Sequence, residues 1–89
     1  MPFELDLPPA FSGWRIKIRD RERLEPPHVT VLWKARAWRI CLRTIQPLDR
    51  HPPTRLLPKS LLSLLRTEQA VLVAAWNRMY PENPVSSDD

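Results

Sequence analysis

The sequence has few of the residues from which catalytic and metal sites are commonly built. Gly13 is the only glycine, so there is no glycine-rich loop to hold a phosphate. Cys41 is the only cysteine, so the chain forms no internal disulfide, and one cysteine with two histidines makes no recognisable zinc pattern. Nucleophile-elbow and zincin motifs are absent as well. These absences favour a protein without metal or other cofactor that is not an enzyme.

The sequence also lacks a long uninterrupted apolar run. The stretch from Leu56 to Trp76 is rich in Leu, Val and Ala, but Pro58, Lys59 and Arg66 are among the residues that interrupt it. The N-terminus has no basic flank followed by an apolar stretch, unlike a secretory signal. We therefore expect no contact with a membrane and a cytoplasmic location, which the lone cysteine also fits.

Apolar and polar residues alternate in three segments, as in strands with one buried face. The pattern predicts an α+β fold whose antiparallel sheet has three strands, at about residues 14–19, 28–33 and 38–43. Alternation places Trp14, Trp33 and Trp38 on the core side, where packing is favoured over base stacking.

A helical region follows the sheet, at about residues 59–80, and is expected to cover one face. Ser60 is a candidate N-cap, Thr67 is a candidate N-cap for a second piece, and Pro81 ends the region. One kinked helix and two short helices both fit. We expect an extended N-terminal segment at 1–10, a single domain at 11–80 and an acidic disordered tail at 81–89.

Positive charge is concentrated in the middle of the chain. Residues 14–66 hold thirteen of the fourteen Lys and Arg but only four acidic residues, although the whole chain has a net charge of +4. A cationic sheet face is typical of proteins that bind RNA or DNA, because arginine suits phosphate geometry. The candidate nucleic-acid-binding residues are Arg15, Lys17, Arg19, His28, Lys34, Arg39 and Arg43.

Other interpretations of this face stay open. Exposed Lys and Arg also keep a small domain soluble, and the same face fits an acidic partner protein. A sheet edge offers a surface for a homodimer. His28 is the candidate acid or base if the protein is a ribonuclease, but a lone histidine at a strand entrance is more often a surface or hydrogen-bonding residue. Cys41 lies between Arg39 and Arg43, which would lower the pKa of an exposed thiol, yet a passive thiol is the simpler interpretation.

The motif Pro26-Pro27-His28-Val29-Thr30 resembles the PPHFH-type motif of the small bacterial proteins called domain of unknown function 4160. Leu57-Pro58-Lys59 resembles the helix entry of that family, and Trp76 resembles its late Trp. The resemblance covers most of residues 11–80 and implies a component of a toxin-antitoxin-like cassette. Thr30 stands where the family has its second histidine, which argues against a metal or catalytic role for a histidine pair.

Overall fold

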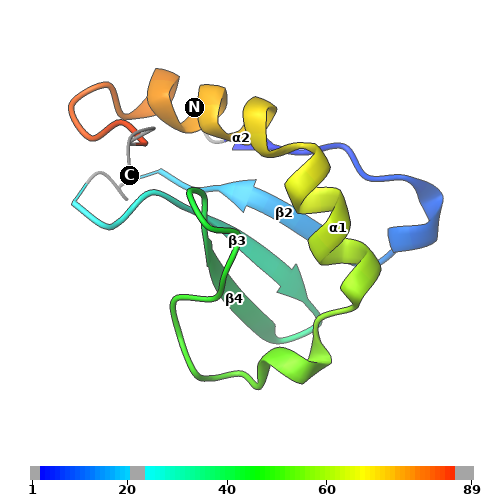
Figure 1. The fold of residues 1–89 in the computed structure, drawn as a ribbon. Coiled ribbons are helices and arrows are strands. Elements are labelled where there is room, and N and C mark those ends of the chain that lie inside the picture. The colour runs from blue at the N-terminus through cyan, green and yellow to red at the C-terminus, as the bar shows by residue number, and fades with distance from the viewer. Residues whose placement is uncertain (1–2, 21–23, 86–89) are drawn as a thin grey trace.

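The computed structural model describes residues 3–20 and 24–85 as two layers, a sheet and a pair of helices (Figure 1). The antiparallel sheet has the order β1-β2-β3-β4. Its strands are β1 (Phe3–Glu4), β2 (Trp14–Ile18), β3 (His28–Trp33) and β4 (Arg36–Cys41). Short 3₁₀ turns lie at Pro9–Phe11 and Thr54–Leu56. The predicted α+β class is therefore confirmed, but the predicted count of three strands is wrong.

The additional strand comes from the segment that was expected only to be extended. Phe3 pairs with Ile18 and Glu4 with Lys17, so two residues of the N-terminal segment extend the sheet beyond β2. A two-residue strand has too short a pattern to show alternation, and the pairing itself stabilises it. At the other edge, the Cys41 N–H donates to the Gln46 carbonyl and the Leu48 N–H to the Arg39 carbonyl, so residues 46–48 cover the C-terminal half of the free edge of β4.

The helical region consists of two helices, α1 (Lys59–Thr67) and α2 (Gln69–Met79). Glu68 both ends α1 and begins α2, so Thr67 is the last residue of α1 and not the N-cap of α2. The predicted N-cap at Ser60 is also wrong. Pro58 takes that position, and its carbonyl accepts hydrogen bonds from the N–H groups of residues 61 and 62. None of the helices within the described residues has the length and apolar composition that a membrane span requires.

The core lies between the sheet and the helices, and its strand residues are the alternate apolar ones. Trp38 and Trp76 are its largest fully buried side chains. Trp14 and Trp33 were expected to be core residues. They pack against the core but stay partly exposed. The other large apolar side chains that are fully buried are Ile16, Ile18, Val29, Val31, Ile40, Leu42, Leu61, Leu65 and Leu72.

The beginning of the expected acidic tail packs onto the domain. The backbone carbonyl of Asn83 accepts a hydrogen bond from the Trp76 indole N–H at 2.7 Å. The side-chain amide of Asn83 donates to the backbone carbonyl of Glu25 at 2.8 Å. The Val85 N–H donates to the side chain of Asn77 at 2.8 Å. Residues 81–85 are therefore held against α2 and the segment before β3, and the rest of the expected tail lies outside the described residues.

Candidate nucleic-acid interface

The register of the sheet brings three of the predicted basic residues to one face. Lys17 pairs with Thr30, and Thr30 pairs with Arg39 across the three central strands. Arg15 is two residues from Lys17 and therefore lies on the same face, opposite the core. Arg19 and Arg43 follow β2 and β4 and are exposed. The alternation thus predicted correctly that Arg15, Lys17 and Arg39 share a face.

Carboxylates neutralise much of this face. The Arg15 guanidinium donates from Nε and Nη2 to the two carboxylate oxygens of Glu4, each at 3.1 Å. Arg39 donates from Nε and Nη2 to Asp49 at 2.8 and 2.7 Å and from Nη1 to Glu25 at 3.2 Å. The expected uniformly cationic face is therefore a mixed one, because acidic side chains distant in sequence fold onto it.

The ion pairs shift the titration of their members. The hydrogen bond from Arg39 lowers the pKa of the Asp49 carboxyl; burial opposes this effect, and the charge of Arg39 adds to it. The hydrogen bond from Arg15 likewise lowers the pKa of Glu4. Both arginines have their own pKa raised by the same hydrogen bonds. Each pair therefore stays ionised at neutral pH.

Replacing Asp49 with Asn is expected to destabilise the protein at pH 7 by on the order of 1 kcal/mol or less, because the pair is more than a third exposed and screened by water. Since the folded carboxyl has a lowered pKa, its contribution is present above the unfolded pKa of about 3.9 and is lost as the pH falls through the folded pKa. The difference between Asp49→Asn and wild type in urea unfolding should disappear in acid. Asp6→Asn, at an exposed site, is the control. If the difference in unfolding free energy between Asp49→Asn and wild type were the same at pH 7 and in acid, the Arg39–Asp49 ion pair would not stabilise the protein.

His28 is buried, contrary to its predicted place on the exposed face. Its side chain has no accessible surface, and Nδ1 lies 2.8 Å from the Pro26 carbonyl oxygen. Because a carbonyl oxygen only accepts, Nδ1 carries the proton and donates. The ring also lies 5.6 Å from the Trp76 ring, and Nε2 lies 3.7 Å from a Glu25 carboxylate oxygen. A buried imidazole does not reach an external phosphate, so we leave His28 out of the interface and of any acid or base role on RNA.

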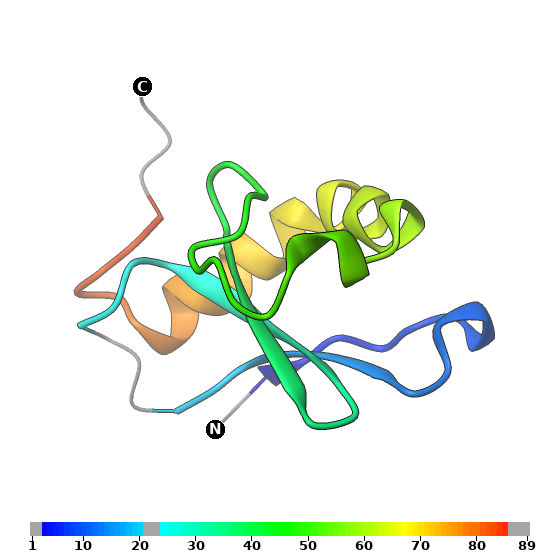
Figure 2. The ribbon, with the colours of Figure 1, turned by 90° about the horizontal axis from the view of Figure 1, so that it is seen from below.

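The turn between β3 and β4 joins cations to an aromatic surface. The Lys34 ammonium lies 4.5 Å and the Arg36 guanidinium 5.8 Å from the centre of the Trp33 ring. Trp33 stacks on Trp14 with ring centres 5.1 Å apart and planes 8° apart, and Trp14 lies 5.9 Å from the buried Trp38. Figure 2 shows this turn at the end of the sheet, away from both helices. The row of rings thus runs from the core to the surface.

Lys34 and Arg36 differ from the arginines of the sheet face. Both are exposed, and neither forms an ion pair with any carboxylate of the residues that the structure describes. A cation over an exposed ring is held by only about 0.5–1 kcal/mol, so an anionic ligand displaces it readily. Arg36 is not among the predicted binding residues, because the sequence pattern places it in a link, whereas the structure makes it the first residue of β4.

At this turn a lysine takes the backbone conformation that is usually taken by glycine. Lys34 has a φ of 55°, in the left-handed region that usually takes glycine, and only Ala35 separates it from β4. The hairpin therefore forms without the Gly or Asn that two-residue turns usually contain. The predicted hairpin is present, and its turn is shorter than predicted.

Cys41 lies beside Arg43 in a small cavity of about 260 Å³. The cavity is lined by Pro26, Pro27, Cys41, Arg43, Pro84 and Val85. Burial raises the pKa of the thiol, but hydrogen bonds with Thr44 and the charge of Arg43 more than offset this, and the net pKa is lowered. The hydrogen bonds with Thr44 contribute more to this lowering than the charge of Arg43, and Arg39, which was expected to contribute, does not.

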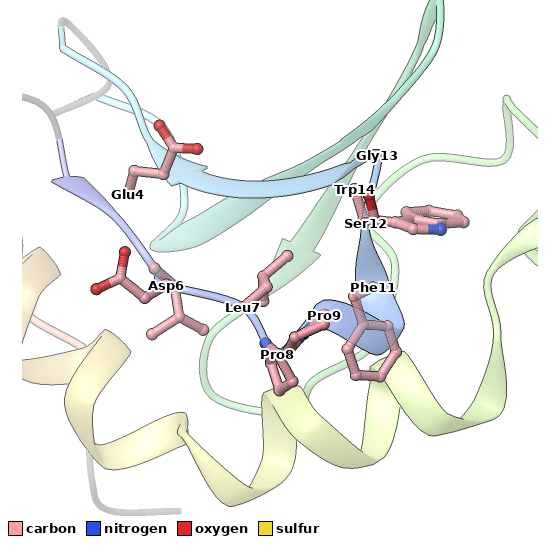
Figure 3. A pocket seen from close by; sticks show the side chains of 10 residues that line it. Glu4, Asp6, Leu7, Pro8, Pro9, Phe11, Ser12, Gly13 and Trp14 are labelled. Carbon is pink, nitrogen blue, oxygen red and sulfur yellow. The ribbon is translucent and has the colours of Figure 1, made fainter.

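A second cavity, of about 350 Å³, lies between the N-terminal segment and the start of β2 (Figure 3). The carboxylates of Glu4 and Asp6 lie toward one end of it, and the rings of Phe11 and Trp14 lie toward the other. Its polar side chains do not converge on one point, so we assign no chemistry to it. Among the described residues, no three His, Cys, Asp or Glu side chains form a group that could hold a metal.

The comparisons with known proteins identify no relative. No family model, no curated protein and no solved structure matches this chain.

Proposed function

We propose that the protein is a non-catalytic binding protein that contacts the phosphate backbone of RNA or DNA. The observation that carries the proposal is the pair of exposed cations at the β3–β4 turn, Lys34 and Arg36, which no described carboxylate neutralises. On a nucleic acid, Lys and Arg side chains bind mainly the backbone phosphates. These contacts do not depend on the base sequence.

The basic sheet face has a smaller part in the proposal than the turn. Arg15 and Arg39 already donate to carboxylates, so a phosphate has to replace Glu4 or Asp49 to reach them. Lys17 lies opposite Glu4 in the sheet, and its charge contributes to the lowered pKa of that carboxyl. Arg19 and Arg43 are exposed at the ends of their strands and extend the cationic surface. The turn is therefore the first point of contact.

A fluorescence anisotropy titration of labelled single-stranded RNA and duplex DNA tests the proposal. We expect saturable binding at low salt that weakens as salt increases, and an intact probe on a gel after the titration. Probe cleavage would contradict the non-catalytic part of the proposal. Absence of binding at low salt would overturn it as a whole and favour the other proposal for these cations, an acidic partner protein.

On the resemblance of Pro26-Pro27-His28 alone, we further propose that the protein is a component of a toxin-antitoxin-like module in the bacterial cytoplasm. The structure gives this motif a packing role, because the Pro26 carbonyl accepts a hydrogen bond from the buried His28 ring. Co-purification of a small acidic protein encoded by a neighbouring gene would support the module. A neighbourhood without such a gene would count against it.

A further inference from the structure

We infer that the β3–β4 turn binds an unpaired strand, with a base stacked on Trp33. This inference rests on the proposed function and names the class of nucleic acid that the turn recognises. The alternation predicts that the three sheet tryptophans pack in the core, yet the structure leaves Trp14 and Trp33 partly exposed, with cations beside the outermost ring.

The arrangement of the rings provides one accessible stacking position. Trp38 is buried, Trp14 lies next to it, and Trp33 lies against Trp14 in an almost parallel stack. One face of the Trp33 indole is therefore occupied by Trp14, and the ring is the outer member of the row. A nucleobase that stacks on its other side continues the row in the same geometry.

The cations beside Trp33 complement the charge of a strand whose base is stacked there. The Lys34 ammonium lies 4.5 Å from the ring centre, on a flexible side chain. An entering base replaces this ammonium over the ring. The displaced Lys34 ammonium is then close enough to bind the phosphate of the same nucleotide. Arg36, 5.8 Å from the ring centre, supplies a second donor for the neighbouring phosphate.

A duplex does not fit this site equally well. Bases within a duplex are stacked on each other and do not present a ring face to a protein, whereas unpaired bases are free to stack on aromatic side chains. Phosphate binding alone favours the duplex, because its charge density is higher. A preference for the single strand is therefore diagnostic of stacking and not of charge.

The test compares wild type, Trp33→Phe and Trp33→Leu on one RNA strand, the DNA strand of the same sequence, and the duplex. We expect wild type to prefer both single strands. Trp33→Leu should weaken single-strand binding by roughly fivefold or more, and Trp33→Phe by less, with duplex binding changed by less than about twofold. Quenching of tryptophan emission by the single strand should be smaller in Trp33→Phe than in wild type.

The outcomes separate this inference from the proposed function. If wild type binds duplex and single strands equally, or if Trp33→Leu weakens both equally, the stacking inference is overturned and phosphate binding stands. If wild type binds no nucleic acid, the proposed function itself fails. Because Trp33 also packs against the core, Trp33→Leu is checked for folding by circular dichroism. Should it fail to fold, Trp33→Phe and the strand preference of wild type still decide the question.

Discussion

Replacing Trp76 with alanine is expected to lower the free energy of unfolding by about 3–5 kcal/mol. The indole is completely buried, and its ring centre lies 4.4 Å from that of Tyr80. Its N–H donates to the Asn83 carbonyl at 2.7 Å, so the substitution also removes one of the hydrogen bonds that hold residues 81–85. A small domain has a total stability of about 5–15 kcal/mol, so the loss should be visible as a large fall in the urea midpoint.

Val71→Ala on the same helix is the matched control. Val71 is 49% exposed, so its truncation should change the free energy of unfolding by no more than about 0.5 kcal/mol. A Trp76→Ala protein as stable as Val71→Ala would show that α2 does not pack on the sheet through Trp76. The positions of Tyr80 and of residues 81–85 would then also be wrong.

The double substitution Lys34→Gln with Arg36→Gln should cause the largest loss of nucleic-acid affinity available from two exposed residues. Each cation that contacts a phosphate contributes about 0.7 to the negative slope of log K against log salt for a single strand. Removing two contacts should therefore reduce that slope by roughly 1.4 and weaken binding most at low salt. The thermal midpoint should stay almost unchanged, because both side chains are exposed.

The pair Arg66→Gln with Arg78→Gln is the control for net charge. These arginines lie in the last turns of α1 and α2 and are exposed, so their loss removes the same total charge from another part of the molecule. We expect a smaller effect on the salt slope than at the turn. Equal effects in the two double variants would mean that binding follows total charge and that the turn is not the site.

The strand alternation predicted much of the fold because β2 and β4 bury every second residue, although β3 is buried on both faces from His28 to Val31. Ile16, Val31 and Trp38 are buried neighbours across three strands, as their spacing predicts. The two-residue strand Phe3–Glu4 was missed because its stability comes from pairing with β2, which no local pattern records. The helix break at Glu68 could not be predicted either, because the periodicity there fits both one helix and two.

The candidate site was less predictable, because its properties depend on residues distant in sequence. Glu4, Glu25 and Asp49 are respectively eleven, fourteen and ten residues from the arginines that they bind. Nothing in the strand pattern marks them as partners. His28 is buried because the segment at Pro26 and the helix residue Trp76 both contact it, and alternation records neither contact.

The measurement that tests the central claim most directly is the affinity of wild type for single-stranded RNA as salt is raised from about 50 to 200 mM. The proposal predicts a linear fall of log K with log salt, and a slope of about −1.4 or steeper, since Lys34 and Arg36 supply at least two phosphate contacts. No binding at the lowest salt, or an affinity independent of salt, would contradict it.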